Sequence, residues 1–315
     1  MTNLLAEDLE HIRQHTAGLW EDLRGARLFL TGGTGFFGTW LLESAVWANR
    51  AYDLGLEVHV LSRNPVAFAH RAPQLASTVR LHEGDVRNFA FPPGSFTHVI
   101  HAATPTHSHW YEEAPEMVLD VIVQGMRRVL DFARAAGAPN PLDVRAVYAE
   151  GKRVAEQLGA IYHQKHGVHV SIARGFAFVG PHLPLDAHFA IGNFIRDGLR
   201  GGPIQVAGDG TPLRSYLHAA DLAIWLWTIL LRGAPCRPYN VGSEEDLSIA
   251  ELARKVADYF HTDVRIARPP VAGAAPSRYV PCSQRAQREL GLRTWIGLDE
   301  ALARTIRWQH SQRGT

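Results

Sequence analysis

The sequence predicts an α/β fold in which a doubly wound parallel sheet carries a smaller C-terminal lobe. Three observations lead to this prediction. Short apolar runs alternate with helix-like segments over the first half of the chain. A glycine-rich turn follows the first of these runs and opens a helix. Beyond about residue 181 the alternation gives way to loops, short strands and helices. We therefore expect one domain over residues 1–180 and a lobe, interleaved with the sheet, over residues 181–315.

The individual elements follow from hydrophobic periodicity. Leucine and isoleucine recur at helical spacing near the N-terminus, whereas the expected strands are short runs of apolar and β-branched residues. The expected strands are residues 26–31, 57–62, 79–84, 96–102 and 168–173. The expected helices are residues 3–23, 39–49, 114–136, 146–166, 189–199, 219–231, 248–259 and 298–310.

Charge and cysteine content exclude several classes of protein. The chain has 32 Lys and Arg against 31 Asp and Glu, so its near-neutral balance argues against a nucleic-acid or membrane-surface partner. Only two cysteines are present, far apart, which fits neither a disulfide framework nor a zinc pattern. The N-terminal residues lack the pattern of a signal peptide, and no apolar run is long enough to span a bilayer. A cytoplasmic location is expected.

Several polar or aromatic side chains are interpreted as structural. His107 and His109 could share a metal, but no third ligand is evident, so no metal site is expected. Asp221 is expected to be the N-cap of its helix. Trp225 and Trp227 lie in an apolar helical run and are expected to be packing residues.

The glycine turn, TGGTGFFG, places glycines at positions 32, 35 and 38 between a strand and a helix. Gly32 permits the tight turn, Gly35 allows a pyrophosphate to approach the backbone, and Gly38 allows close packing of helix and strand. The helix N-terminus then faces the phosphates with its partial positive charge. A plain turn that needs glycine only for its dihedral angles is the alternative. The context of strand and helix favours a dinucleotide site.

A second motif places Tyr148 and Lys152 one helical turn apart, on the same side of a helix. Tyrosine is a poor base at neutral pH because its ordinary pKa is about 10. A neighbouring ammonium group favours the phenolate, which could then accept a proton from a substrate hydroxyl. Taken alone, such a pair is more often a buried tyrosine and a surface lysine on an ordinary amphipathic helix.

Taken together, the glycine turn, Gly84-Asp85, His101-Ala-Ala103, the YxxxK motif and the NVGS and RYVP segments resemble the extended short-chain dehydrogenase/reductase family. The resemblance is closest to its NAD-dependent epimerase/dehydratase branch, which acts on nucleotide sugars, and it covers nearly the whole chain. It implies a Rossmann-like sheet and Tyr148 and Lys152 as catalytic residues. The implied cofactor-binding residues are Gly32, Gly35, Phe36, Phe37, Gly38, Ser62, Arg63, Asp85, Val86, His101, Ala102, Ala103, Tyr148 and Lys152. The implied substrate-binding residues are Thr104, Asn193, Arg214 and Arg278.

The cofactor is expected to be NAD, with NADP as the alternative. The second strand ends in Leu61-Ser-Arg-Asn64, where an acidic residue usually holds the ribose hydroxyls of NAD. Arg63 could instead accept a 2′-phosphate. Enzymes of this branch regenerate their own cofactor and usually hold NAD tightly, which favours NAD.

The segment before Tyr148 departs from the pattern of the family. The resemblance implies a strand that ends in a catalytic Ser or Thr, but residues 137–145 hold Gly, Pro, Asn and Asp and are expected to form a turn. Three explanations stay open: a stretch omitted from the sequence, which we favour; a truly shortened and damaged protein; or another segment that fills the place in the sheet. No Ser or Thr can be assigned as the third catalytic residue.

The leading expectation is an enzyme that acts on a nucleotide-diphosphate sugar. It would oxidise a ring hydroxyl, at C4, before epimerisation, dehydration or decarboxylation. Paired arginines suit a diphosphate because each guanidinium bonds two oxygens. The alternatives are an NADPH-dependent keto-sugar reductase and a degenerate cofactor-binding protein. The resemblance also implies a homodimer through helices 114–136 and 146–166.

Overall fold

The computed structural model describes residues 5–104, 115–136, 140–144, 149–187, 189–271, 273 and 275–313. The chain divides into two compact units. The sheet unit comprises Ala6–Gly175 and Ala223–Tyr239, and the second unit comprises Met1–Leu5, Phe176–Leu222 and Asn240–Thr315. The chain therefore leaves the sheet unit at residue 175, returns to it at residue 223 and leaves it again at residue 239.

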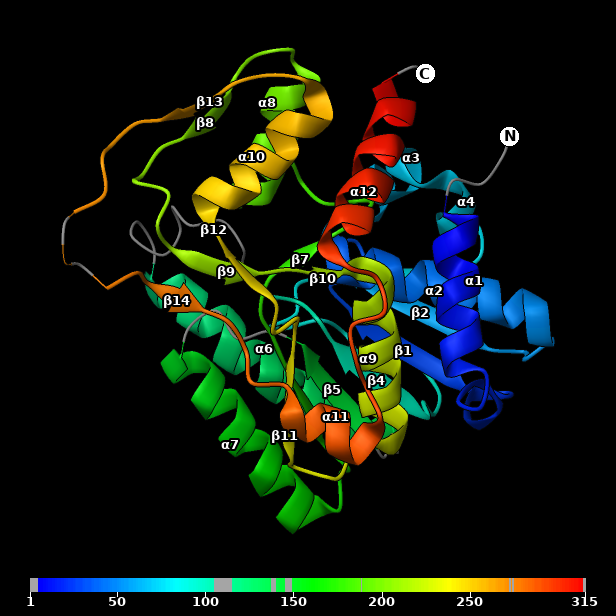
Figure 1. Ribbon diagram of the computed structural model, residues 1–315. Helices are drawn as coiled ribbons and strands as arrows, with labels where there is room; N and C mark the ends of the chain where they lie inside the picture. The colour runs from blue at the N-terminus through cyan, green and yellow to red at the C-terminus, as the bar shows by residue number, and fades with distance from the viewer. Residues whose placement is uncertain are drawn as a thin grey trace. The chain divides into compact units, whose positions relative to one another are not determined.

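The sheet unit is built on a seven-stranded sheet with strand order β11-β6-β5-β4-β1-β2-β3 (Figure 1). The pairs from β3 to β6 are all parallel. The strands are β1 (Arg27–Thr31), β2 (Glu57–Ser62), β3 (Arg80–Glu83), β4 (His98–His101), β5 (Asn140–Val144), β6 (Ser171–Gly175) and β11 (Pro238–Val241). The predicted doubly wound parallel sheet is confirmed.

The strand β5 corrects the prediction for residues 137–145. We expected a turn, but Asn140–Val144 pairs in parallel with β4 on one side and with β6 on the other. Hydrogen bonding to two neighbours overrides the weak strand propensity of Asn, Pro and Asp. The place in the sheet is therefore filled by part of the linker itself, and not by another segment as the third explanation supposed. Its sequence, NPLDV, still contains no Ser or Thr.

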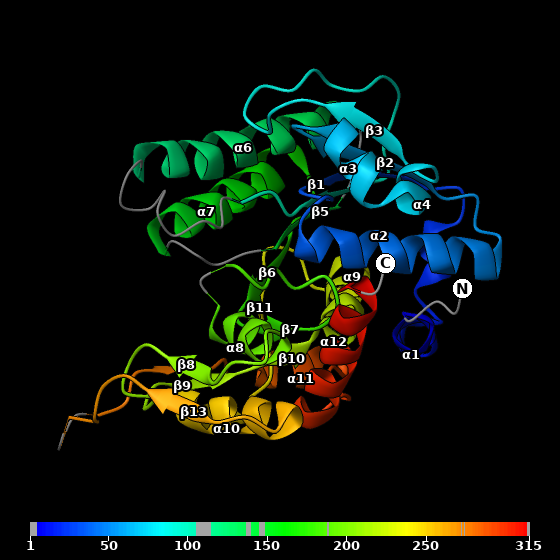
Figure 2. The same ribbon diagram turned by 90° about the horizontal axis from the view of Figure 1, so that it is seen from above.

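Helices cover both faces of the sheet, as right-handed crossovers require, with α6 and α7 together on one face and α2 on the other (Figure 2). The side chains of α6 form two buried clusters, one over Phe29 and Val99 of the sheet and one with Ala155 of α7. The helices are α1 (Ala6–Thr16), the 3-10 helix η1 (Trp20–Leu23), α2 (Phe36–Tyr52), α3 (Pro65–Arg71), α4 (Pro73–Ala76), α6 (Pro115–Ala136), α7 (Ala149–His166) and α9 (Ala219–Arg232).

The N-terminal helix is shorter than predicted. Residues 3–23 were expected to form one helix, but α1 ends at Thr16 and η1 begins at Trp20. The hydroxyl of Thr16 donates to the carbonyl of Ile12 and accepts from the Trp20 indole at 2.8 Å. These bonds, with Gly18 between the two segments, turn the chain so that Trp20 packs on Trp227, with ring centroids 5.1 Å apart. Trp225 and Trp227 are both buried, as predicted.

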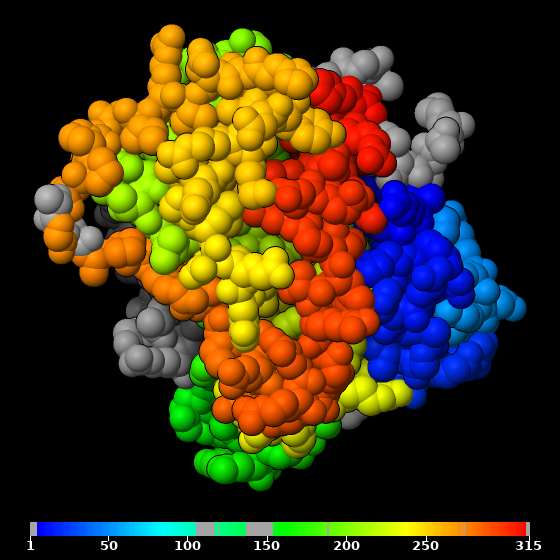
Figure 3. Space-filling model, in the orientation of Figure 1, coloured from blue at the N-terminus to red at the C-terminus, as the bar shows by residue number. Residues whose placement is uncertain are grey.

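The second unit is a collection of small sheets and helices. Its sheets are β10-β7, β12-β9-β14 and β13-β8. On the surface seen in Figure 3, α10 and α12 lie side by side, and Lys255 Nζ lies 2.6 Å from Asp299 Oδ1 across them. The elements are β7 (Phe178–Val179), α8 (Ala190–Leu199), β8 (Ile204–Val206), β9 (Leu213–Ser215), β10 (Leu217–His218), β12 (Asp246–Ser248), α10 (Ile249–Phe260), β13 (Val264–Ile266), β14 (Arg278–Tyr279), α11 (Gln284–Leu290) and α12 (Leu298–Arg313).

Candidate functional site

Two glycines of the turn after β1 are required by packing. Gly32 has φ +72°, and a Cβ placed there would lie 2.5 Å from the carbonyl carbon of Ala102. A Cβ at Gly38 would lie 2.3 Å from the carbonyl oxygen of Gly32. Both contacts are far below van der Waals distance, so only glycine fits. At Gly32 the turn is thereby held against the end of β4.

Gly35 is different, because the protein itself leaves room for a side chain there. Its φ is −88°, it is exposed, and a Cβ would lie 3.4 Å from the carbonyl oxygen of Gly32. It is also the N-cap of α2 and supplies no side-chain cap to the first amides of that helix. The predicted role of this glycine, to let a pyrophosphate approach the helix N-terminus, stays a prediction.

The residues that follow β2 lie beside this turn, because β1 and β2 are adjacent and in register from Arg27–Glu57 to Thr31–Leu61. Ser62 is buried, and its hydroxyl accepts a bond from the backbone N–H of Asn64. Arg63 is exposed. Phe36 is half-buried and Phe37 is buried, with their rings edge to face.

Asp85 carries a partner that the sequence analysis did not assign. Its carboxylate accepts bonds from Arg87 Nε at 2.8 Å and Nη2 at 3.1 Å, and from the Arg87 backbone N–H. These bonds, the side-chain ones first, hold the pKa of Asp85 below its ordinary value. The spacing of two residues was the available signal. The next residue, Val86, is buried, and Gly84 donates its N–H to the carbonyl of Ser62.

The end of β4 closes the same region. His101 is buried, and its Nδ1 lies 2.8 Å from the hydroxyl of Thr31 on β1. Ala102 donates its N–H to the carbonyl of Thr31, and Ala103 and Thr104 follow, both half-buried. The predicted cofactor residues from β1, β2 and β4 are therefore gathered at the carboxyl ends of adjacent parallel strands. Ligands of open α/β sheets bind at this edge.

The predicted catalytic pair is described only in part. Tyr148 lies outside the described residues. Lys152 lies in the first turn of α7, and its side chain is likewise outside the description. The same holds for His107 and His109. Among the residues that the structure describes, no group of three His, Cys, Asp or Glu side chains could hold a metal ion.

Arg214 and Arg278 both lie in the three-stranded sheet β12-β9-β14, but the strand register separates them. Arg278 pairs with Leu213, and Tyr279 pairs with Arg214. Paired residues share a face and successive residues alternate, so the two arginines lie on opposite faces. Arg278 Nε donates to Asp246 at 2.8 Å, whereas Arg214 donates to the carbonyl groups of Leu213 and Ser277. This arrangement does not bring the two guanidinium groups together.

Asn193 lies in α8, half-buried, with its side-chain oxygen 3.1 Å from Nη1 of Arg196. Asn193 is a predicted site residue, whereas Arg196 is not. Their spacing of three residues on one helix was the signal that could have found the pair.

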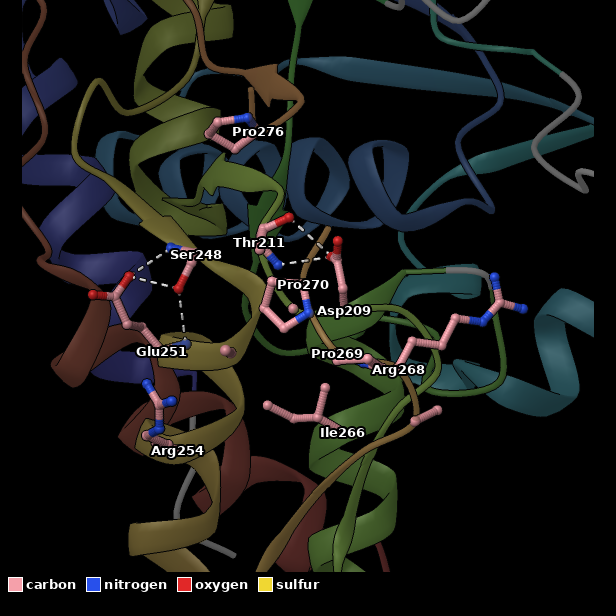
Figure 4. Close-up of a pocket in the computed structure, with 13 residues that line it drawn as sticks. Asp209, Thr211, Ser248, Glu251, Arg254, Ile266, Arg268, Pro269, Pro270 and Pro276 are labelled. Carbon is pink, nitrogen blue, oxygen red and sulfur yellow. Dashed lines mark hydrogen bonds between the residues drawn. The ribbon is translucent and has the colours of Figure 1, made fainter. Parts of the chain in front are cut away.

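A pocket of about 750 Å³ opens in the second unit, at the N-terminus of α10 (Figure 4). Its acidic groups already have partners: Asp209 accepts from the N–H and hydroxyl of Thr211, and Ser248 and Glu251 form a capping box. Figure 4 shows Arg268 extending away from these residues. None of the predicted site residues lines this pocket.

Asp221 has a role other than the predicted N-cap. The helix α9 begins at Ala219, and its second residue donates its N–H to Nδ1 of His218. Asp221 lies inside the first turn, fully buried, and its carboxylate accepts the backbone N–H groups of Trp295 and Ile296 at 2.8 and 2.9 Å. Asp221 therefore holds the backbone at Trp295 and Ile296 in place by two hydrogen bonds within the second unit.

In the described part of the chain, no helix has both the length and the apolar character that a membrane crossing requires. The cytoplasmic location stays a prediction.

The sheet, the glycine turn and the polar groups gathered at its carboxyl edge define a dinucleotide-binding α/β enzyme. The model of the NAD-dependent epimerase/dehydratase family matches residues 28–140 and 138–242. The chain belongs to this family, which is described as NAD-dependent. The match is divided in two at residues 138–140, within the segment where the sequence departs from the family pattern.

Relatives and solved structures extend this assignment. The chain is 28% identical to UDP-glucuronic acid decarboxylase 6 of Arabidopsis thaliana over 304 residues, 88% of this chain and 86% of that protein. The WbmF enzyme of Bordetella bronchiseptica, solved with NADH, is similar with a TM-score of 0.81 at 22% identity, over 93% of this chain and 94% of that one. DesIV of Streptomyces venezuelae, a dTDP-glucose 4,6-dehydratase solved with NAD and TYD, has a TM-score of 0.76 at 25% identity, over 91% and 98%.

Proposed function

We propose that the protein binds a nucleotide-diphosphate sugar and oxidises its C4 hydroxyl before a second step on the keto-sugar. The glycine turn supports the cofactor part of this proposal, because the fold leaves room for a side chain at Gly35. The names of the relatives, UDP-glucuronic acid decarboxylases, and the TYD complex of DesIV support a nucleoside-diphosphate substrate.

The chain would hold NAD at the carboxyl ends of β1, β2 and β4. The first amides of α2 would face the pyrophosphate, and Gly35 would permit its approach. Ser62 and Arg63 would contact the adenosine ribose, and Asp85 and Val86 the adenine. The cofactor, when bound, would supply the hydride acceptor for oxidation of the sugar.

Tyr148 would remove the proton of the sugar hydroxyl. Lys152, one helical turn away, would favour the phenolate form of this tyrosine. Asn193 and one of the two arginines would bind the diphosphate. Arg214 and Arg278 lie on opposite faces of their sheet, so only one of them would bind the diphosphate. We propose that this one is Arg278, which would leave its ion pair with Asp246 when the diphosphate binds.

Decarboxylation is the second step that the relatives favour. A uronic acid oxidised at C4 is a β-keto acid. Its C5–carboxylate bond breaks with loss of CO₂, and the electron pair moves onto the C4 carbonyl oxygen. No additional oxidant is needed for this bond cleavage.

Turnover of a small panel tests the proposal. UDP-glucuronic acid, UDP-glucose and dTDP-glucose are incubated with the protein and NAD, and nucleotide-sugar products are separated by chromatography. We expect loss of CO₂ from UDP-glucuronic acid and no product with Tyr148→Phe. Turnover that is unchanged in Tyr148→Phe would refute the proposed role of the tyrosine.

Two observations favour alternative functions. Arg63 stands where a carboxylate would select NAD, which favours an NADPH-dependent keto-sugar reductase; net consumption of NADPH during turnover would identify it. The strand β5 holds no Ser or Thr, which favours a protein that binds its cofactor without catalysis. Cofactor binding with no product from any sugar of the panel would support the second alternative.

The oligomeric state is a further proposal. The helices α6 and α7 pack together, and Val154 on α7 is 43% exposed, so an apolar position stays open on this pair. We propose a homodimer through α6 and α7. Sizing chromatography with light scattering tests it, and a monomer at micromolar concentration would contradict it.

A further inference from the structure

Arg196 occupies a fixed position in the second unit, between α8, the segment before it and β8. Its side chain is 24% exposed. Nε and Nη2 lie 3.3 and 3.0 Å from Oδ1 of Asp197, and Asp197 itself accepts the backbone N–H of Gln205 on β8. Nη1 donates to the carbonyl of Leu185 and lies 3.6 Å from Asp186. These contacts on three sides define the orientation of the guanidinium group.

The backbone around Arg196 is also closely packed. A Cβ placed at Gly192, one residue before Asn193, would lie 2.9 Å from the carbonyl oxygen of Pro184. The first turns of α8 and the segment 184–186 are therefore in contact, and Arg196 spans the same boundary through Leu185. Little freedom is left for α8 to shift relative to this segment.

The remaining bond of Nη1 determines the orientation of the Asn193 amide. A guanidinium group has only donors, so the group that faces it must be the amide oxygen. Nη1 lies 3.1 Å from that oxygen, Oδ1. The NH₂ group of Asn193 therefore points away from Arg196. Among the hydrogen bonds of the described residues, this NH₂ group has no acceptor, and it offers two donors to a ligand oxygen.

We infer that Arg196 is a positioning residue that orients the Asn193 amide as a hydrogen-bond donor to the diphosphate of the substrate. The inference rests on the proposed function, in which Asn193 contacts that diphosphate. Without Arg196 the amide is free to rotate and present its oxygen, which repels a phosphate oxygen. With Arg196 in place the productive orientation exists before the ligand arrives, so less conformational entropy is lost on binding.

A double-mutant cycle on the full-length protein tests the inference, with free UDP and dTDP as probes in titration calorimetry. We expect Arg196→Ala to weaken binding of the nucleoside diphosphate about fivefold to tenfold in the wild-type background. In the Asn193→Ala background the same substitution should have no further effect, since there is no amide left to orient. The affinity for NAD should stay unchanged in every variant.

Two further variants separate positioning from simple stabilisation. Asn193→Asp keeps an acceptor for Arg196 and should preserve the melting temperature, yet it places a negative charge at the diphosphate and should abolish binding. Arg200→Ala is the matched control, because Arg200 lies on the same segment, 64% exposed and 4.0 Å from Asp186. It should bind the probes as the wild type does.

The outcomes are distinguishable. Equal losses from Arg196→Ala with and without Asn193 would show a general structural role and overturn the inference, as would full affinity in Asn193→Asp. If the wild type binds neither UDP nor dTDP, the proposed function fails, and the inference fails with it.

Discussion

Nδ1 of His59 lies 2.8 Å from Nε2 of His82, on the adjacent strand of the sheet. The two rings are stacked with their planes 10° apart, and Phe96 packs edge-on against His59. A hydrogen bond between two imidazole nitrogens needs one donor and one acceptor, so it exists only while at least one ring is neutral.

This histidine pair should make the protein sensitive to acid. Burial, the first cause in each case, lowers the pKa of both rings below the ordinary value of 6.5. The unfolded chain therefore binds protons more readily than the folded one, so the free energy of unfolding should decrease as the pH falls below about 6.5. His82→Gln keeps a hydrogen-bonding partner and should make this decrease shallower between pH 7 and pH 5.

Urea unfolding at several pH values provides the measurement. His70→Gln, on the exposed side of α3, is the control and should leave the pH dependence unchanged. If the free energy of unfolding of His82→Gln decreases as steeply with falling pH as that of the wild type, the histidine pair is not the cause.

Glu43 should also make the free energy of unfolding depend on pH, but in the opposite direction from the histidine pair. It lies on α2, where burial raises the pKa of its carboxyl to about 7, against the opposing charge of Arg50. A raised folded-state pKa means that stability is present below the unfolded value near 4.5 and is lost as the pH rises through 7. Glu43→Gln should therefore raise the free energy of unfolding by about 1–2 kcal/mol at pH 8, and little at pH 4.

The same unfolding assay applies, with the exposed Glu245→Gln as control. No stabilisation at pH 8 would show that the carboxylate is adequately solvated in the folded protein.

The glycines of the turn should separate folding from ligand binding. Gly38→Ala forces a Cβ to 2.3 Å from the Gly32 carbonyl oxygen and should unfold the protein or lower its melting temperature by well over 10 °C. Gly35→Ala has an allowed backbone conformation and room for the methyl group. It should change the melting temperature by only a few degrees while weakening NAD binding at least about tenfold.

Differential scanning calorimetry and NAD titration together make this comparison. Wild-type affinity for NAD in Gly35→Ala would place the pyrophosphate elsewhere.

Asp221 should be a major determinant of stability in the second unit. Asp221→Ala leaves the buried N–H of Ile296 and that of Trp295 without their acceptor, which should cost about 3 kcal/mol. Asp221→Asn retains an acceptor oxygen and should cost less than half as much. Denaturant unfolding distinguishes the two, and equal losses would mean that charge, rather than the hydrogen bonds, matters here.

Periodicity in the sequence predicts the parallel sheet well, because strands such as Arg27–Thr31 are buried on both faces and read as continuous apolar runs. Periodicity does not predict the strand Asn140–Val144, because pairing with a strand on each side, and not local composition, determines its conformation. The short helices α3 and α4 were missed as well, since each begins at a proline and spans at most two turns.

Local sequence patterns likewise predict one part of the candidate site and not the other. The glycine turn and Asp85 are adjacent to their strands, so local patterns predict their place. The separation of Arg214 from Arg278 depends on the register between β9 and β14, which are far apart in the sequence, and no local pattern encodes it. Arg87 and Arg196 lie within three residues of the side chains they hold, and a search for such neighbours could have found them.

The order of the strands also bears on how the protein is made. The strand β6 has β5 on one side and β11 on the other, but β11 follows residues 176–222 and α9 in the chain and is therefore synthesised later. Until β11 pairs with it, β6 is an open edge, with unpaired backbone groups that can bind another chain. A nascent chain in which β6 has emerged from the ribosome before β11 would therefore expose this edge, and chaperone capture during translation should be strongest over that interval.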